Sequence, residues 1–143
     1  MNPAKSTLSP ELIEAYRQTH YQVHDNPPFT LQIDEPSSAL MSLFDKKGIQ
    51  RCAFLTAYNP FSKQTSEIQN CERQSELKAL VDAQGLPYLE GIGQHPSGEW
   101  PGEPSLLILG ITRENAGKLA MHFGQNAFVW AGSNATPSLH LLR

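Results

Sequence analysis

Apolar residues recur along this chain with two different spacings, and the spacing changes from one segment to the next. Helical spacing of about 3.6 residues follows Ser9, Ser37, Ser66 and Thr112, and serine and threonine are favoured helix N-cap residues. Alternating or unbroken apolar runs, which are typical of strands, occupy 29–33, 51–58, 87–92, 105–110, 126–131 and 138–142. The pattern predicts a mixture of helices and strands, with the strand at 87–92 as the weakest element.

The order of these elements favours one fold class. From residue 51 to 131 the chain reads strand, helix, strand, strand, helix, strand, which is the split βαβ order of a ferredoxin-like unit. A helix-strand-helix extension precedes it, and its first helix is expected to carry His20 on its apolar side. The prediction is an α/β (α+β) fold with a ferredoxin-like core, and a three-layer α/β sheet is the alternative. We expect a single domain over 1–143, frayed at 1–8.

Composition and charge narrow the function classes. Hydrophobic residues make up 39% of the chain and charged residues 17%, which excludes the composition of a disordered chain. The formal net charge of -3 gives no basic surface of the kind that binds nucleic acid or anionic lipid. No apolar run reaches the length of a membrane span, and Cys52 and Cys71 form no CxxC pair. We therefore expect a reduced cytoplasmic protein without nucleic-acid or membrane partners.

The helix predicted at 66–84 is apolar on its inner side in its second half and polar on the same side in its first half. The polar inner positions are Ser66, Asn70 and Arg73. Because the helix follows a strand, its N-terminus should lie above the carboxyl end of the sheet, where open α/β sheets bind ligands. Free N–H groups there and the Arg73 guanidinium suit a carboxylate or phosphate. The preceding loop, with Asn59, would form the rim of this anion pocket.

A purely structural interpretation competes with this pocket on equal terms. An arginine beneath a helix can pair with a protein carboxylate, for which Asp34, Glu99 and Glu103 are candidates. Asn70 can instead hold the loop at 59–65 in place. The sequence leaves both interpretations open.

The segment 90–105 is long for a hairpin loop, and long loops are often functional. Its candidate pocket residues are His95, Glu99, Trp100 and Glu103. The alternative is that Trp100 fastens the loop while the other side chains are solvated. This alternative is favoured for His95 and Glu99 and less so for Glu103, which precedes a core strand.

Gln125 and Asn126 lie between a helix end and a strand start, where amides usually serve turns. In the predicted topology this turn lies at the opposite end of the sheet from the start of the 66–84 helix. Gln125 and Arg73 are therefore not expected to share a pocket.

Other chemical motifs are weak in this sequence. His20 and His24 lie close in the chain, but no third ligand is evident, so no metal site and no cofactor are expected. Ser62 and Ser66 have no convincing His/Asp pair, and the chain contains no GxSxG or Walker motif.

Several spaced pieces of the sequence resemble a known family. They are AY at 15–16, TAYNP at 56–60, N..RQ at 70–74, GEWPGEPSLLILG at 98–110 and FGQNA at 123–127. Together they resemble the bacterial family called domain of unknown function 3293, over about residues 13–131. The resemblance implies a short, single-domain protein without an assigned activity, so it supplies no catalytic residues. The positions that match the family pattern are Asn59, Asn70, Arg73, Glu103 and Gln125.

Three functional hypotheses follow from these observations. The first is a binding or sensing module for a small anionic or phosphorylated ligand. The residues that would bind this ligand are Arg73, Asn70, Ser66 and Asn59. The second is an enzyme acting on such a ligand, with Glu103 as general acid or base. The third is a protein-interaction module, such as a homodimer formed through an open sheet edge or through the region of Trp130.

Overall fold

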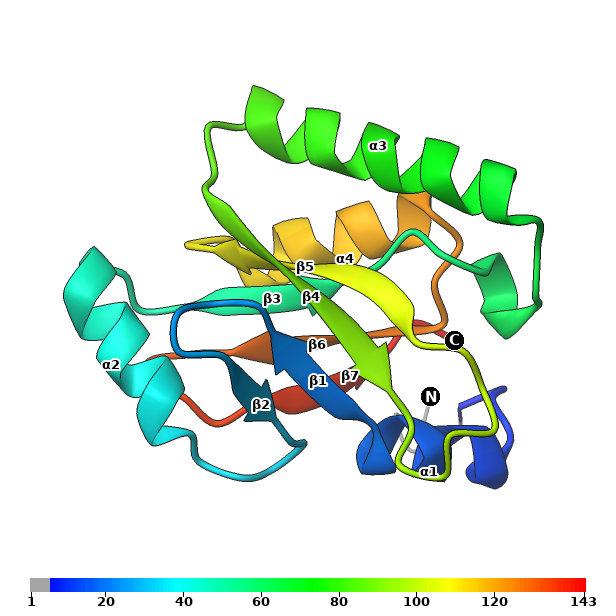
Figure 1. Cartoon of the computed structure of the whole chain (residues 1–143), viewed down its shortest axis with the longest axis horizontal. Coiled ribbons are helices and arrows are strands. Elements are labelled where there is room, and N and C mark those ends of the chain that lie inside the picture. The colour runs from blue at the N-terminus through cyan, green and yellow to red at the C-terminus, as the bar shows by residue number, and fades with distance from the viewer. Residues whose placement is uncertain (1–5) are drawn as a thin grey trace.

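The computed structural model describes residues 6–143. Residues 1–5, which make up most of the segment 1–8 that was predicted to be frayed, lie outside the described residues. Every strand pairs antiparallel with its neighbours, in the order β2-β1-β4-β5-β3-β6-β7. The elements are α1 (Pro10–Gln18), β1 (His20–Val23), β2 (Phe29–Leu31), α2 (Ser38–Lys47), β3 (Cys52–Leu55), the short helix η1 (Pro60–Ser62), α3 (Glu67–Ala83), β4 (Tyr88–Gln94), β5 (Glu103–Leu109), α4 (Arg113–His122), β6 (Ala127–Ala131) and β7 (Ser138–Leu141) (Figure 1). The predicted α+β class is confirmed.

The sheet is larger than the four strands of a ferredoxin-like unit. Its inner strands β4, β5, β3 and β6 come from the predicted strand-helix-strand-strand-helix-strand segment. β1 and β2 extend the sheet beyond β4, and β7 extends it beyond β6. Helices lie on both faces, with α3 and α4 on one side and α1 and α2 on the other (Figure 1).

Each face of the sheet has its own hydrophobic core, because successive side chains of a strand point to opposite faces. In β3, Ala53 and Leu55 belong to the core beneath α3 and α4. Cys52 and Phe54 belong to the core that contains α2. The unbroken apolar run of this strand is therefore buried on both sides, as predicted.

The first helix ends earlier than predicted, and His20 belongs to a strand, β1, that the sequence analysis missed. Thr19 Oγ1 donates to the carbonyl oxygen of Ala15 at 2.7 Å, and the Tyr21 hydroxyl donates to the carbonyl oxygen of Tyr16 at 2.6 Å. These two side chains satisfy carbonyl groups that a helix end leaves open. The helix therefore ends without the glycine or proline that would have marked its end in the sequence.

β4 had the weakest prediction because glycine lowers strand propensity, and β4 contains Gly91 and Gly93. The structure shows why glycine is needed there. A Cβ at Gly91 would lie 2.3 Å from the carbonyl oxygen of Gln22 in β1. The close approach of β1 to β4 thus requires a residue that the sequence pattern counts against a strand.

Candidate functional site

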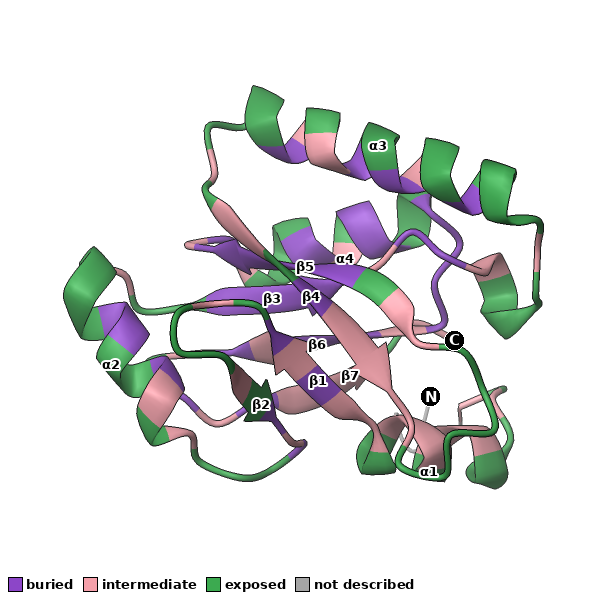
Figure 2. Ribbon diagram, in the orientation of Figure 1, coloured by how far each residue is buried: buried purple, intermediate pink, exposed green. Residues whose placement is uncertain are grey.

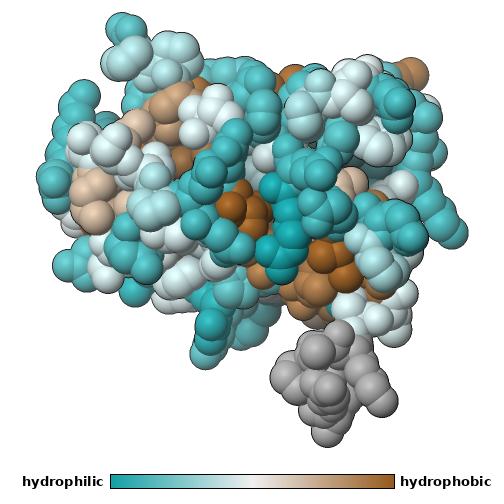
Figure 3. Space-filling view, turned by 90° about the horizontal axis from the view of Figure 1, so that it is seen from below, coloured by the Kyte–Doolittle hydropathy of each residue, from teal (hydrophilic) through white to brown (hydrophobic). Residues whose placement is uncertain are grey.

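A cavity of about 570 Å³ lies between α1 and the α2-side face of the sheet. Its walls come from α1, from the strands β1, β3, β4, β5, β6 and β7, and from the loops at 59–64 and 95–101. Seen from the side of α1 and α2, the surface shows hydrophobic groups exposed between hydrophilic ones (Figure 3). The cavity volume falls within the range of about 300–1,000 Å³ that is usual for small-molecule sites.

Helix α1 forms one wall of the cavity instead of packing into a core. It has no buried residue, whereas α2, α3 and α4 each bury several (Figure 2). Its side chains Leu12, Ala15 and Tyr16 line the cavity. Leu12 and Tyr16 therefore face an open space, whereas His20, which was expected on the same side of the helix, lies in β1.

Glu103 is a half-buried carboxylate at the start of β5, and it lines the cavity. Asn59 Nδ2 donates to Glu103 Oε2 at 2.8 Å. Within residues 6–143, Glu103 makes no ion pair and no lysine or arginine lines the cavity. Burial raises the pKa of Glu103 above its usual value, and the hydrogen bond from Asn59 offsets part of this effect.

A chain of hydrogen bonds connects Glu103 to the start of α3. Arg73 Nη1 donates to Thr65 Oγ1 at 3.3 Å, and Thr65 Oγ1 donates to Asn70 Oδ1 at 2.6 Å. Asn70 Nδ2 then donates to Asn59 Oδ1 at 2.9 Å, and Asn59 donates to Glu103. All four bonds point in the same direction, from a guanidinium to a carboxylate. Such chains polarise their members, so the charge of Arg73 strengthens the donor that holds Glu103.

Three of the four predicted ligand-binding residues do not line this cavity. Ser66 is the N-cap of α3, and its Oγ accepts from the Gln69 amide at 3.2 Å. Asn70 is 3% exposed and bonds to the loop before the helix, and Arg73 bonds to Thr65. Of the four predicted ligand-binding residues, Asn59 is the one that lines the cavity. Glu103, the predicted general acid or base, also lines it. The polar inner side of α3 therefore holds the 59–65 loop, and the cavity lies under α1 instead.

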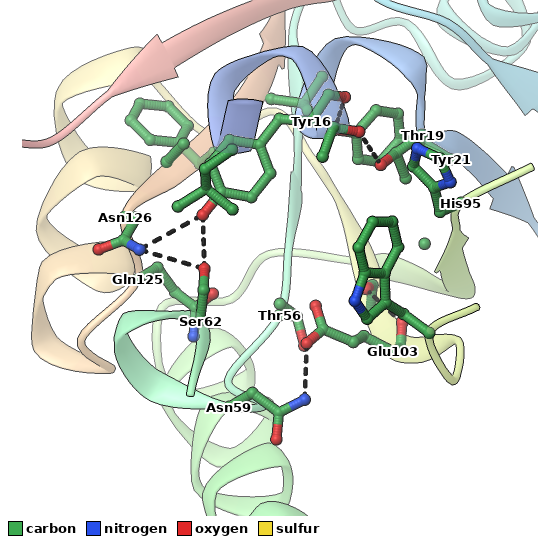
Figure 4. Close-up of a pocket in the computed structure, with 18 of the residues that line it drawn as sticks. Tyr16, Thr19, Tyr21, Thr56, Asn59, Ser62, His95, Glu103, Gln125 and Asn126 are labelled. Atoms are coloured by element: carbon green, nitrogen blue, oxygen red, sulfur yellow. Dashed lines mark hydrogen bonds between the residues drawn. The ribbon is translucent and has the colours of Figure 1, made fainter. Parts of the chain in front are cut away.

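A second polar cluster lies across the cavity from Glu103 (Figure 4). The hydroxyl oxygens of Tyr16 and Ser62 are 2.5 Å apart, and Asn126 Nδ2 donates to Ser62 Oγ at 3.1 Å. Ser62 has a positive φ of 57° and Phe61 one of 59°, a conformation that is unusual for residues other than glycine. Such strained residues cluster at functional sites.

Gln125 lies at the same end of the sheet as the start of α3, so the expectation that placed it at the opposite end is wrong. Gln125 Nε2 donates to the carbonyl oxygen of Tyr58 at 3.0 Å, and Gln125 lines the cavity. The expectation failed because β3 and β6 are antiparallel neighbours. The start of β6 must therefore lie beside the end of β3, from which the chain continues toward α3.

The long loop between β4 and β5 contributes residues to the cavity, although the sequence analysis favoured solvated positions for His95 and Glu99. His95, Glu99 and Trp100 all line the cavity. The rings of His95 and Trp100 lie edge to face, with centroids 4.7 Å apart. The contributions of Tyr16 and Asn126 were missed, although both fall within pieces of sequence that resemble the family. That resemblance was the available signal for them.

Among residues 6–143, no three or more histidine, cysteine, aspartate or glutamate side chains are grouped as a metal ion would require. Within the same range, none of the helices combines the length and apolar composition that a membrane crossing needs.

Comparison with known proteins gives a match to a protein family. The family described as "Protein of unknown function (DUF3293)" matches residues 55–128, just over half of the chain. The match includes Asn59, Glu103 and Gln125 but ends before β7. No curated protein and no solved structure matches the chain.

Proposed function

The chain belongs to the DUF3293 family of proteins of unknown function, and we propose that the cavity under α1 binds a small molecule carrying an amine or other cationic group. The observation that carries this proposal is Glu103. This carboxylate is half-buried in a cavity and has no cationic partner among residues 6–143. Removing a carboxylate from water without a counter-charge costs free energy, and a ligand ammonium group would supply that charge.

The remaining walls of the cavity suit the carbon skeleton of such a ligand. Most small-molecule sites combine apolar and aromatic walls with a few polar groups that set orientation. The aromatic residues that line the cavity are Tyr16, Tyr21, Phe54, Trp100 and Phe128. Aromatic rings also attract cations through the negative potential of their faces. The walls and the single half-buried carboxylate thus favour the same class of ligand.

The hypothesis of an anionic or phosphorylated ligand receives less support from this geometry. It requires the Arg73 guanidinium to contact the ligand, and Arg73 instead donates to Thr65 outside the cavity lining. An anion in the cavity would also lie near the Glu103 carboxylate and would be repelled by it. The anionic ligand therefore stays a prediction, and the experiment below includes it as a competing outcome.

An enzyme that uses Glu103 as general acid or base is the second candidate. A carboxyl group with a raised pKa in a cavity is the kind of group that transfers protons near neutral pH. Both candidates place a ligand against Glu103, so binding is the first property to measure. A homodimer through the edge strands β2 or β7 stays a separate prediction.

The test is a thermal-shift screen followed by titration calorimetry. The panel contains primary, secondary and quaternary amines, each with the alcohol and the carboxylate of the same carbon skeleton. An amine at about 100 times its dissociation constant should add about 2.7 kcal/mol to the free energy of unfolding. We expect Glu103→Gln to weaken amine binding at least about tenfold.

The control variant is Glu72→Gln, which removes an exposed carboxylate of α3 outside the cavity lining. It should leave amine binding unchanged. If no amine raises the melting temperature, the proposal is wrong. Tighter binding of phosphate compounds or carboxylates, lost in Arg73→Ala, would instead support the anionic ligand.

A further inference from the structure

The cluster of Tyr16, Ser62 and Asn126 contains one hydroxyl hydrogen more than its hydrogen bonds use. Asn126 Nδ2 lies 3.1 Å from Ser62 Oγ and 3.4 Å from the Tyr16 hydroxyl oxygen, and it donates to both. Because these two oxygens are only 2.5 Å apart, they share one amide hydrogen. The two hydroxyl groups share one hydrogen bond of 2.5 Å. Whichever hydroxyl donates in that bond, the hydrogen of the other hydroxyl has no acceptor among residues 6–143. The cluster therefore offers one free O–H donor.

This free donor belongs to the cavity. Tyr16, Ser62 and Asn126 all line it, and they lie together across the opening from Glu103 and Asn59 (Figure 4). The cavity thus has a surplus donor on one side and a surplus acceptor, the carboxylate of Glu103, on the other.

Arg143 makes the free hydroxyl group a stronger donor through its hydrogen bond to Asn126. Its Nε donates to Asn126 Oδ1 at 3.0 Å, and its Nη2 donates to the carbonyl oxygen of Gln125 at 3.3 Å. The guanidinium carbon lies 4.6 Å from the centroid of the Phe61 ring, which fixes the position of Arg143. Because Arg143 pulls electron density from the Asn126 amide, the hydroxyl groups that this amide contacts become better donors.

We propose that this cluster binds a carbonyl-type oxygen of the same ligand whose amine contacts Glu103. The ligand class is then an amino compound that carries an amide or ester oxygen at its other end. The inference rests on the proposed function for the amine end only. The acceptor end follows independently from the hydrogen count around Tyr16 and Ser62.

The test uses amino amides with one to five methylene groups between the amine and the amide. Each is compared with the alkylamine that lacks the amide and the alkylamide that lacks the amine. In the wild type, the best amino amide should bind about five- to tenfold more tightly than its matched alkylamine. Each single variant leaves one hydroxyl group able to donate, so the double variant Tyr16→Phe/Ser62→Ala should abolish this gain. In that variant the amino amide should bind no more tightly than its matched alkylamine. Ser75→Ala, an exposed α3 position outside the cavity lining, should keep the gain.

The possible outcomes separate the two proposals. Equal affinities of amino amide and alkylamine in the wild type, or a gain that persists in the double variant, would overturn the inference. If alkylamines do not bind but alkylamide binding is lost in the double variant, the acceptor end is supported and the amine site is wrong. If no compound of the series binds, both are wrong.

Discussion

Helices α1 and α3 approach the same end of the sheet from opposite faces, and their inner sides are used in opposite ways (Figure 1). The inner side of α3 begins with polar residues, which suggested a ligand site, but those residues bond to the protein itself. The inner side of α1 is apolar, which is typical of a helix packed on a core, but α1 has no buried residue and lines a cavity. Polarity beneath a helix is therefore weaker evidence for a site than an apolar side that finds no packing partner.

The polar half of α3 serves the site indirectly. Asn70 Oδ1 accepts from the backbone N–H of Asn59 at 2.9 Å, and Gln74 Oε1 accepts from the backbone N–H of Ala57 at 3.0 Å. Both bonds hold the segment that joins β3 to α3. This segment presents Asn59 to Glu103, so the polar residues of α3 position the site without reaching the cavity.

The largest expected difference between the two helices concerns their leucines. Leu77 of α3 is 1% exposed, so Leu77→Ala should lower the free energy of unfolding by about 2–5 kcal/mol. Leu12 of α1 borders a cavity and has fewer packing partners, so Leu12→Ala should cost less than about 1 kcal/mol. Urea unfolding of both variants measures the two losses. Losses of equal size would mean that α1 is packed as tightly as α3.

The next effect concerns the buried amide of Asn70. Asn70→Ala removes the side chain that bonds to both Asn59 and Thr65 and leaves buried polar groups without partners. We expect a loss of about 2 kcal/mol in the free energy of unfolding. Gln69→Ala, at an exposed neighbouring position, is the control and should stay within about 0.5 kcal/mol of the wild type. A loss in Asn70→Ala no larger than in the control would contradict the scaffold role of α3.

The smallest effect is the pH dependence that Glu103 contributes to the free energy of unfolding. The direction of this dependence identifies it. Burial raises the pKa of this carboxyl group above its usual value of 4.5, so the folded protein holds the proton more tightly than the unfolded chain. Stability from this group is therefore full below pH 4.5 and is lost as the pH rises through the folded pKa. Glu103→Gln does not titrate and keeps the hydrogen-bond acceptor for Asn59.

Chemical unfolding of the wild type and Glu103→Gln across this pH range measures the effect. The variant should gain stability relative to the wild type as the pH rises above 4.5, with the largest gain above the folded pKa. Glu72→Gln controls for the loss of one negative charge. A relative gain on lowering the pH would show that the carboxylate is stabilised in the folded protein.

Most helix starts were predictable from the sequence because N-capping is local. Ser9, Ser37, Ser66 and Thr112 each accept a hydrogen bond from the backbone amide of the residue three positions later. The apolar run of β3 was equally readable, because burial on both faces needs no knowledge of the partner strands. β1 was missed because side chains end the preceding helix, and its pairing with β4 joins distant segments.

The candidate site likewise combines features that the local sequence indicates with features that depend on distant contacts. Residue types alone pointed to Asn59 and Glu103, because polar groups that flank core strands stand out in a linear pattern. The cavity itself depends on α1 crossing to the sheet and on contacts such as that between Tyr16 and Asn126, which are 110 positions apart. Sequence spacing carries no information about such contacts. Whether a polar side chain meets another part of the protein or an open space is therefore settled only when the chain has folded.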